Sequence, residues 1–452
     1  MAFRVGGMGL ADSKSKGDRW YYTFLPYNVA GGSTSPMIPL FVTEGLKGTV
    51  ADVGIVGAIS SLASVPANII WGNLSDTTRK RKVFVLIGFL GLAIALLTMG
   101  LSMDMGAYYF GNFLLGAIAA AAAPVSTVII LESFAKEEWA KRIGDFSKIS
   151  GIGWVLGLVL GTIWLQLASD DGSTVAAMRG LFITASALCM VSILLAAKWV
   201  PEPARKMERK EAVGEVPASH LMHFERGRYA PTKIIHIMKV SAKNLSPHNF
   251  PGNLRLYFIV TFLAFTGFLT FYTAFPIFLK RELGLTISEV FIVYLASSIT
   301  SALTYSLAGR WTSLVGGKKV QAMAFVGRIF LFPTVFLVTM LGLSFWPMMA
   351  VLCVLHAGIG FCWANLSVAG NTIVSHISYK DFRTESLGAY NAIMGIGTIV
   401  GSLVGGLVAT SMGYEVTFLV ASGFVVSALV LLLVLRVDKE PDDTTSPHAV
   451  EG

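Results

Sequence analysis

The sequence predicts an all-helical integral membrane protein. Hydrophobic residues make up 54% of its 452 residues and charged residues only 14%, against about 25% charged in soluble domains. A soluble chain with this balance would expose large apolar patches, and a disordered chain would be polar and poor in aromatic residues. The apolar residues fall in long stretches between short polar segments, which is typical of helices that cross a bilayer.

Twelve apolar stretches are long enough to span a membrane, because a helix needs about 20 mostly apolar residues to cross the hydrocarbon layer. Helices are expected there because they satisfy their own backbone hydrogen bonds. The expected spans are residues 20–43, 50–72, 83–102, 106–131, 147–168, 175–199, 255–279, 287–309, 319–341, 346–374, 386–410 and 414–436. A long polar segment between the sixth and seventh spans separates two groups of six.

The positions of lysine and arginine predict the orientation and the domains. If both termini are cytoplasmic, 30 of the 35 Lys and Arg residues lie on the cytoplasmic side, four lie outside, and Arg328 lies within a span. Cytoplasmic loops are enriched in these residues, so the net charge of +8 reports topology and no nucleic-acid partner is expected. The expected parts are a cytoplasmic tail (1–19), a six-helix bundle (20–199), a cytoplasmic linker (200–253), a second six-helix bundle (254–437) and a cytoplasmic tail (438–452).

The two groups of six spans are similar in sequence. Pro39-Leu40-Phe41 recurs as Pro276-Ile277-Phe278, with an offset of 237 residues, and a ladder of glycines in the fifth span recurs in the eleventh with an offset of 244. Glycines at such spacing let helices approach closely in lipid. The predicted helix-packing residues are Gly153, Gly157, Gly161, Gly397, Gly401 and Gly405.

The segment between the second and third spans carries the most specific motif. It reads Gly72-Asn73-Leu74-Ser75-Asp76-Thr77-Thr78-Arg79-Lys80-Arg81. Together with the two repeats, it resembles the major facilitator superfamily, whose pattern is Gly-x-Leu-small-Asp, then a basic residue, any residue, Gly and two basic residues. Thr77 replaces the usual basic residue and Arg79 the usual glycine. The resemblance implies a conformational switch made of Gly72, Asp76, Arg79, Lys80, Arg81 and Glu132.

The resemblance also implies a solute site at mid-membrane, between the first, fourth, seventh and tenth spans. The predicted substrate-cavity residues are the polar and aromatic residues at that depth: Asn28, Ser35, Asn112, Thr270, Tyr272, His356, Trp363 and Asn365. Because this set contains no fixed charge, we expect a small neutral or amphiphilic organic solute. Anionic solutes such as sugar phosphates would be expected to need arginine or lysine there.

Proton coupling is left open by the sequence. An ionisable residue inside the membrane is a functional candidate by default, and Arg328 is the deepest charge, although a long side chain can reach back to the interface. His356 is the mid-span group that titrates near neutral pH when unperturbed. The coupling candidates are Glu132, Asp145, Arg328 and His356, and facilitated diffusion is the alternative.

The sequence predicts a secondary transporter in the plasma membrane that resembles the multidrug and small-solute efflux branch, with protons as a candidate coupling ion. The fifth span lacks the proline of the antiporter signature, so a permease or uniporter for a neutral metabolite such as a sugar is the alternative. A transport-inactive membrane sensor is the alternative from another class. No enzyme is expected, because the spans lack His-Glu-x-x-His, paired aspartates and a phosphate-binding loop. We expect no cofactor and no metal ion, and we expect the functional form to be a monomer.

Overall fold

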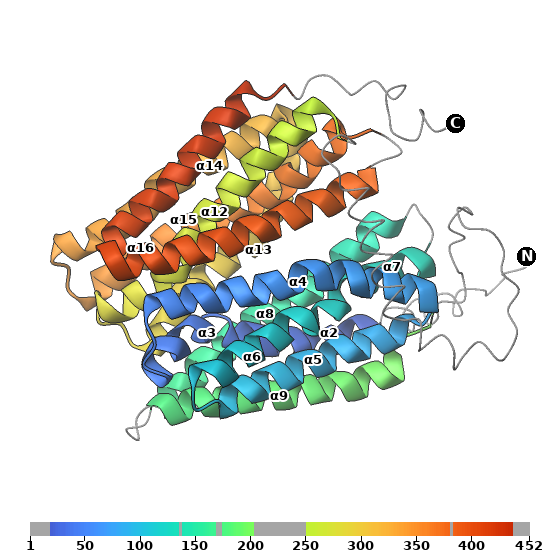
Figure 1. Cartoon of the computed structure of the whole chain (residues 1–452), viewed down its shortest axis with the longest axis horizontal. Coiled ribbons are helices and arrows are strands. Elements are labelled where there is room, and N and C mark those ends of the chain that lie inside the picture. The colour runs from blue at the N-terminus through green and yellow to red at the C-terminus, as the bar shows by residue number, and fades with distance from the viewer. Residues whose placement is uncertain (1–18, 135–137, 169–173, 203–249, 380–382, 437–452) are drawn as a thin grey trace, which may run out of the picture.

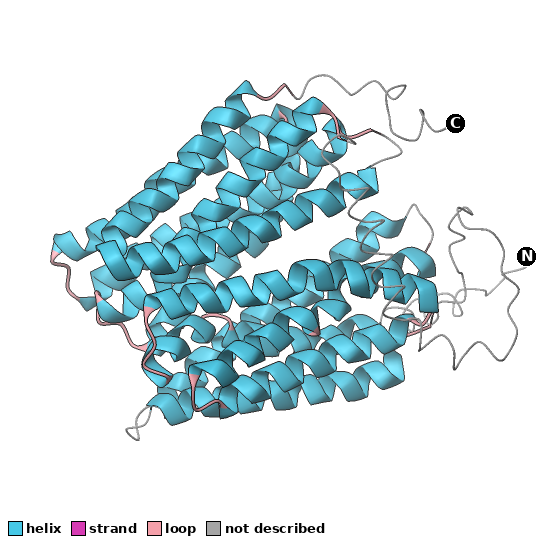
Figure 2. Ribbon diagram, viewed as in Figure 1, coloured by secondary structure: helices cyan, strands magenta, loops and turns pink. Residues whose placement is uncertain are grey.

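The computed structural model describes residues 19–134, 138–168, 174–202, 250–379 and 383–436. All regular elements in these ranges are helices (Figure 2). Almost all of the predicted N-terminal tail, most of the predicted linker and the whole of the predicted tail at 438–452 lie outside the described residues.

The helices follow the predicted spans closely. The first half contains η1 (Arg19–Thr23), α2 (Phe24–Thr34), α3 (Met37–Leu40), the π-helix η2 (Phe41–Gly45), α4 (Val50–Thr78), α5 (Arg81–Leu101), α6 (Met105–Ala117), η3 (Ala119–Ala121), α7 (Ala122–Ser133), α8 (Trp139–Ala168) and α9 (Thr174–Trp199). The second half contains α12 (Gly252–Arg281), α13 (Ile287–Val315), α14 (Gly317–Leu337), η6 (Val338–Leu341), α15 (Phe345–Ile377) and α16 (Arg383–Val434).

Ten helices among the described residues are long and apolar enough to cross a membrane, against twelve expected. The difference arises at two places. The expected span at 20–43 is helical in successive short pieces, and α2 ends just before Pro36, whose ring and missing N–H interrupt a helix. The spans expected at 386–410 and 414–436 are joined in α16, where Gly413 has a non-helical φ of 87° and ψ of 175°.

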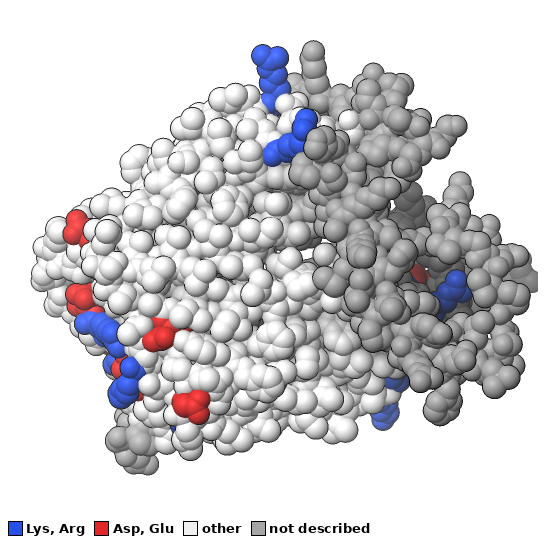
Figure 3. All heavy atoms as spheres, viewed as in Figure 1, with Lys and Arg blue, Asp and Glu red and all other residues white. Residues whose placement is uncertain are grey.

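The helices form two bundles, α2–α9 and α12–α16, drawn in blue to green and in yellow to red (Figure 1). In that view the bundles lie close together at the first turns of α4 and diverge toward the end that carries α7. Charged side chains on the face shown in Figure 3 gather at the ends of the helices, and the surface between is uncharged. The distribution fits an apolar band between two polar surfaces.

Equivalent glycines pack against equivalent positions in the two halves. A β-carbon added to Gly153 would lie 2.9 Å from the Leu25 carbonyl oxygen, and one added to Gly397 would lie 2.8 Å from that of Phe262. The two glycines are 244 residues apart and their partners 237, the offsets found in the sequence. Contact of this kind lets α8 pack closely on α2 and α16 on α12.

The starts of α4 and α13 are also equivalent. Thr49 and Asp52 form a capping box at α4, in which each side chain accepts a hydrogen bond from the other residue's backbone N–H. Thr286 and Glu289, 237 residues later, do the same at α13. Such a box satisfies two backbone donors that a helix start would leave unpaired.

Candidate functional site

A cavity of about 540 Å³ lies between the two bundles. Ser35 and α8 form its wall on the first bundle, and α12, α13, α14 and α15 form the wall on the second. Its lining residues are Ser35, Gly151, Trp154, Val155, Leu158, Phe265, Phe268, Leu269, Tyr272, Tyr294, Ser297, Ser298, Ser301, Ala302, Tyr305, Arg328, His356 and Trp363. The volume and the aromatic walls suit an organic solute.

Four of the eight predicted substrate-cavity residues line this cavity: Ser35, Tyr272, His356 and Trp363. The other four are not among its lining residues. Asn28, Asn112, Thr270 and Asn365 each donate a side-chain hydrogen bond, 2.8–2.9 Å long, to the carbonyl oxygen four residues earlier. Each of the four residues therefore has a donor satisfied by its own helix, whereas the Asn365 Oδ1 atom has no hydrogen-bond partner.

One face of α13 supplies cavity residues that were not predicted from the sequence. Tyr294, Ser297, Ser301 and Tyr305 recur at spacings of three and four, which places them on the same side of the helix. Ser301 donates to the carbonyl oxygens of Ser297 and Gly360 at 2.9 and 2.8 Å. The spacing of these polar residues is visible in the sequence, but α13 is the eighth span, and the resemblance implies a solute site between the first, fourth, seventh and tenth.

Arg328 corrects the expectation that the cavity carries no fixed charge. Its side chain lines the cavity and only 1% of the residue is exposed. It does not reach back to the interface: its guanidinium carbon lies 4.0 Å from the centre of the Phe268 ring. A cation above an aromatic face is favourable, so the Phe268 ring helps to hold the charge inside the protein.

His356 lies in an aromatic setting beside Arg328. Its ring stacks on Phe275 at 4.6 Å between centroids and 12° between planes, and Tyr294 lies 5.1 Å away. The His356 Nδ1 atom has no hydrogen-bond partner, and the residue is 1% exposed. The imidazole therefore presents a polar atom that neighbouring side chains leave unpaired.

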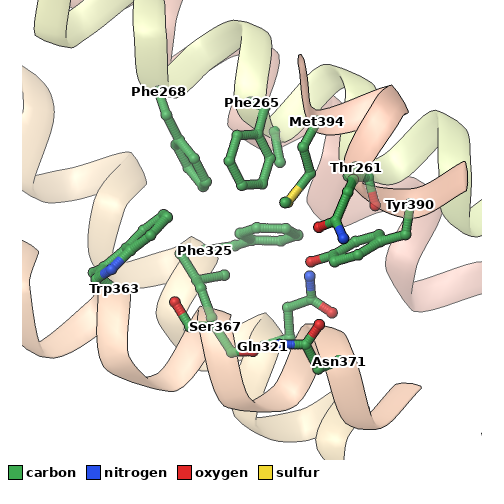
Figure 4. Close-up of a pocket in the computed structure, with 13 residues that line it drawn as sticks. Thr261, Phe265, Phe268, Gln321, Phe325, Trp363, Ser367, Asn371, Tyr390 and Met394 are labelled. Atoms are coloured by element: carbon green, nitrogen blue, oxygen red, sulfur yellow. Dashed lines mark hydrogen bonds between the residues drawn. The ribbon is translucent and has the colours of Figure 1, made fainter. Parts of the chain in front are cut away.

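A smaller pocket of about 120 Å³ adjoins the cavity within the second bundle. Phe265, Phe268 and Trp363 line both. Figure 4 shows these rings at one end of the pocket and the polar side chains of Gln321, Asn371 and Tyr390 at the other. The aromatic rings thus separate a large cavity with a cationic group from a small pocket with uncharged polar groups.

The predicted switch residues Arg81 and Glu132 form a buried ion pair. Arg81 Nη2 lies 2.6 Å from Glu132 Oε1, and Nε donates to Oε2 at 3.0 Å, so the guanidinium group binds the carboxylate through two atoms. Arg81 Nη1 also donates to Ser75 Oγ at 2.9 Å. Side-chain exposure is 8% for each member of the pair. Two parallel charge-assisted bonds fix α5, α4 and α7 relative to one another.

Glu202, at the end of the first bundle, completes this cluster. Its carboxylate accepts hydrogen bonds from the backbone amides of Arg81 and Lys82 at the first turn of α5. A carboxylate at a helix N-terminus is favourable because the amides there have no partner within the helix. Glu202 was not predicted from the sequence, since 120 residues separate it from Lys82.

The other predicted switch and coupling residues are dispersed. Gly72 has no atom within 4 Å of where a β-carbon would lie. Lys80 and Asp145 are exposed. Asp76 falls within α4, but its side chain lies outside the described part of the structure. Among the coupling candidates, Arg328 and His356 face the cavity, whereas Glu132 is paired with Arg81.

Arg79 adopts the backbone conformation that suits glycine. It ends α4 with φ 54° and ψ 26°, in the left-handed region. A residue with a β-carbon is disfavoured there by about 1 kcal/mol relative to glycine. Arg79 therefore occupies the left-handed turn that the resemblance assigns to glycine, and the departure from the motif leaves the turn geometry in place.

We expect Arg79→Gly to raise the free energy of unfolding by about 1 kcal/mol, because glycine removes the left-handed penalty. Thermal unfolding of the purified protein in lipid nanodiscs measures this. Lys80→Gly is the control, because Lys80 has φ −113° and needs no glycine. A lower melting temperature for Arg79→Gly than for the unsubstituted protein would contradict the prediction.

The comparisons with known proteins agree on one family. The profile of the Major Facilitator Superfamily matches residues 23–366 and 257–451. An uncharacterized MFS-type transporter of Methanocaldococcus jannaschii is 24% identical over 411 residues, covering 88% of this chain and 89% of its own. The multidrug resistance protein MdtG of Salmonella arizonae is 24% identical over 421 residues, covering 90% and 91%.

Solved structures show the same fold. A single-residue mutant of the nucleoside transporter NupG matches with a TM-score of 0.71 at 15% identity, over 93% of this chain and 99% of its own. The human organic anion transporter MFSD10 matches with a TM-score of 0.61 at 15% identity, over the same shares. The family consists of membrane transporters rather than enzymes. This confirms the resemblance to the family and the expectation that the protein is not an enzyme. The chain, with its multiple membrane-spanning helices, is a member of the Major Facilitator Superfamily of transporters.

Proposed function

We propose that the protein exports a small amphiphilic organic solute across the plasma membrane by alternating access, with both termini in the cytoplasm. The observation that carries this proposal is the cavity between the two bundles, to which both contribute walls. In a transporter built from repeats, rocking of one repeat against the other exposes such a site to each side in turn.

The proposed architecture is twelve spans in two six-helix repeats, at 20–199 and 254–437. The broken first span and the joined last two account for the count of ten candidate spans among the described residues. The glycine contacts of α8 on α2 and of α16 on α12 support the repeat, as do the capping boxes of α4 and α13. The same close helix contacts within each half favour movement of each half as a rigid body.

Direct contacts between the bundles support an inward-facing conformation. The Ala51 amide donates to Thr410 Oγ1 at 2.9 Å, and Glu44 Oε1 lies 3.7 Å from Arg281 Nε. Both contacts lie at the end of the helices that the distribution of lysine and arginine assigns to the outside. Near the opposite end, Gly72 and Gly388 have no atom within 4 Å of a β-carbon position.

Efflux is the proposed direction because MdtG, a multidrug resistance protein, matches 90% of the chain. Inside-out membrane vesicles test it. With a proton gradient imposed, they should accumulate labelled amphiphilic solutes when they contain the protein and not when they lack it. Accumulation of a sugar by right-side-out vesicles alone would instead support the uptake alternative. Absence of transport in both vesicle preparations would support the alternative of a transport-inactive membrane sensor.

A reversible cross-link tests alternating access. We expect Glu44→Cys with Arg281→Cys, joined by a short bifunctional methanethiosulfonate reagent, to reduce transport to the level of protein-free vesicles. The link would hold the outer ends together, and reduction with dithiothreitol should restore activity. Each single cysteine variant, treated identically, controls for labelling and for the three native cysteines. Full transport by the cross-linked variant would contradict alternating access.

Protons are the proposed coupling ion, and His356 is the proposed group that carries them, because an imidazole can bind and release a proton and this one faces the cavity with its Nδ1 atom unpaired by neighbouring side chains. In the same vesicles, a pH-sensitive dye should report solute-dependent proton movement. His356→Gln should abolish that movement and leave downhill solute exchange, whereas Asp145→Asn on the exposed part of α8 should leave both unchanged. Proton movement that survives His356→Gln would exclude this assignment.

A further inference from the structure

The cavity contains a buried cation without an acidic partner. Arg328, on α14, is among the largest fully buried side chains. Its guanidinium carbon lies 4.0 Å from the centre of the Phe268 ring and 5.7 Å from those of Phe332 and Trp363. No ion pair joins it to a carboxylate within the described ranges, and no Asp or Glu lines the cavity.

The guanidinium group also retains unused hydrogen-bond donors. Its Nε and Nη1 atoms have no partner, while the Tyr272 hydroxyl group interacts with the side chain. A buried charge that is neither paired nor fully hydrogen-bonded is strongly unfavourable. A side chain kept in this condition at the wall of a cavity is suited to a partner that enters from outside.

The chemistry of that partner follows from the surroundings. The Nε and Nη1 donors point along different edges of the planar guanidinium group, and each can donate a charge-assisted hydrogen bond to an oxygen of a carboxylate or sulfonate. The rest of the wall is largely aromatic and includes Trp154, Phe265, Tyr294 and Trp363. A solute that pairs with the guanidinium group and also packs against the aromatic wall would be an organic anion with an apolar ring body. An amphiphilic cation would place like charges together, and a neutral solute would leave Arg328 unpaired.

We propose that the cavity binds amphiphilic organic monoanions, with Arg328 pairing the oxyanion and the aromatic wall covering the ring. This deepens the proposed function and rests on it for the direction of movement, but binding can be tested separately. Within the expected class of neutral or amphiphilic organic solutes, it favours amphiphilic anions over neutral solutes. Arg328 is thereby a specificity-determining residue that contacts the solute.

The test uses three probes with one ring body: 2-naphthoate, 2-naphthamide and (2-naphthylmethyl)trimethylammonium. Equilibrium binding of each labelled probe is measured on the full-length protein in nanodiscs. We expect 2-naphthoate to bind about ten- to a hundredfold more tightly than 2-naphthamide, the range of a charge-assisted hydrogen bond. The cation should bind most weakly.

Arg328→Met should abolish the preference for 2-naphthoate and leave 2-naphthamide binding within about twofold. Its melting temperature without ligand should not fall, because an unpaired buried charge is removed. If Arg328 only stabilised the fold, the substitution would lower the melting temperature. Arg328→Lys should keep part of the preference, since a lysine keeps the charge but has a single donor nitrogen in place of several. Arg310→Gln, which removes the same charge from the end of α13, should bind all three probes as the unsubstituted protein does.

The outcomes separate this inference from the proposed function. Equal binding of the anion and the amide, or a preference that survives Arg328→Met, would overturn the inference even if vesicles transport the amide. Arg328-dependent binding of 2-naphthoate supports it even if no vesicle preparation moves any probe, a result that would instead overturn the proposed transport. Displacement of labelled 2-naphthoate by acetate as effectively as by unlabelled 2-naphthoate would also overturn it, since the site would then be one for small anions.

Discussion

Gly157→Ala is expected to lower the free energy of unfolding by about 2 kcal/mol. A β-carbon there would lie 2.7 Å from the Ser33 nitrogen and would overlap the Val29 carbonyl oxygen, so α8 would have to move away from α2. Overpacking of this kind costs up to about 3 kcal/mol, and the higher helix propensity of alanine offsets about 1 kcal/mol. Denaturant-induced unfolding in bicelles, followed by tryptophan fluorescence, measures the difference.

Glycines on the same helices provide matched controls. Gly144, also on α8, has no atom within 4 Å of a β-carbon position, so Gly144→Ala should raise stability by up to about 1 kcal/mol. Gly401 meets the Thr266 carbonyl oxygen, and Gly401→Ala should resemble Gly157→Ala. Equal stability of the Gly144 and Gly157 variants would show that the close approach of α8 and α2 is not required.

Glu132→Gln should lower the free energy of unfolding by about 3 kcal/mol, because it leaves the buried Arg81 guanidinium without its counter-charge. Arg81 binds both carboxylate oxygens, at 2.6 and 3.0 Å, and both side chains are shielded from solvent. The same unfolding measurement detects the loss. Glu138→Gln is the control: Glu138 is 46% exposed and pairs with Arg142 one turn away, so the change should be below about 0.5 kcal/mol.

A paired substitution separates stability from switching. Replacing both members, Arg81→Met with Glu132→Leu, should recover most of the stability, since a buried ion pair can be exchanged for apolar side chains of similar size. If the pair is part of the conformational switch, transport should still be lost. Normal transport by the stable double variant would show that the pair only holds the first bundle together.

Much of the architecture could be predicted from local properties of the chain. The helix starts of α9, α13 and α15 fall within one residue of those expected, because long apolar stretches can cross lipid only as helices. α8 begins eight residues earlier than expected, at Trp139, because its first two turns are polar and carry no hydropathy signal. The last turns of α4, which contain Asp76, are also polar, so hydropathy did not predict that they are helical.

The site was less predictable than the helices. Asn112 and Asn365 have the polarity of cavity residues, yet the amide nitrogen of each donates to a carbonyl group of its own helix, and neither residue lines the cavity. Tyr305 and Ser298 lie on a helix to which no solute contact was assigned. The polarity of a buried side chain indicates that it needs a hydrogen-bond partner. It does not indicate whether that partner is a solute or the backbone carbonyl group four residues earlier.

The sequence alone therefore determined how many apolar stretches there are, where the lysines and arginines lie between them, and which glycines recur. Each of these depends on the residue itself and on the thickness of a membrane. Only the tertiary structure decided that Arg81 pairs with Glu132 and that Arg328 faces a cavity without a carboxylate. These arrangements depend on the rotation of each helix about its axis, which is set by contacts among helices far apart in the chain, such as those at Gly157 and Gly401.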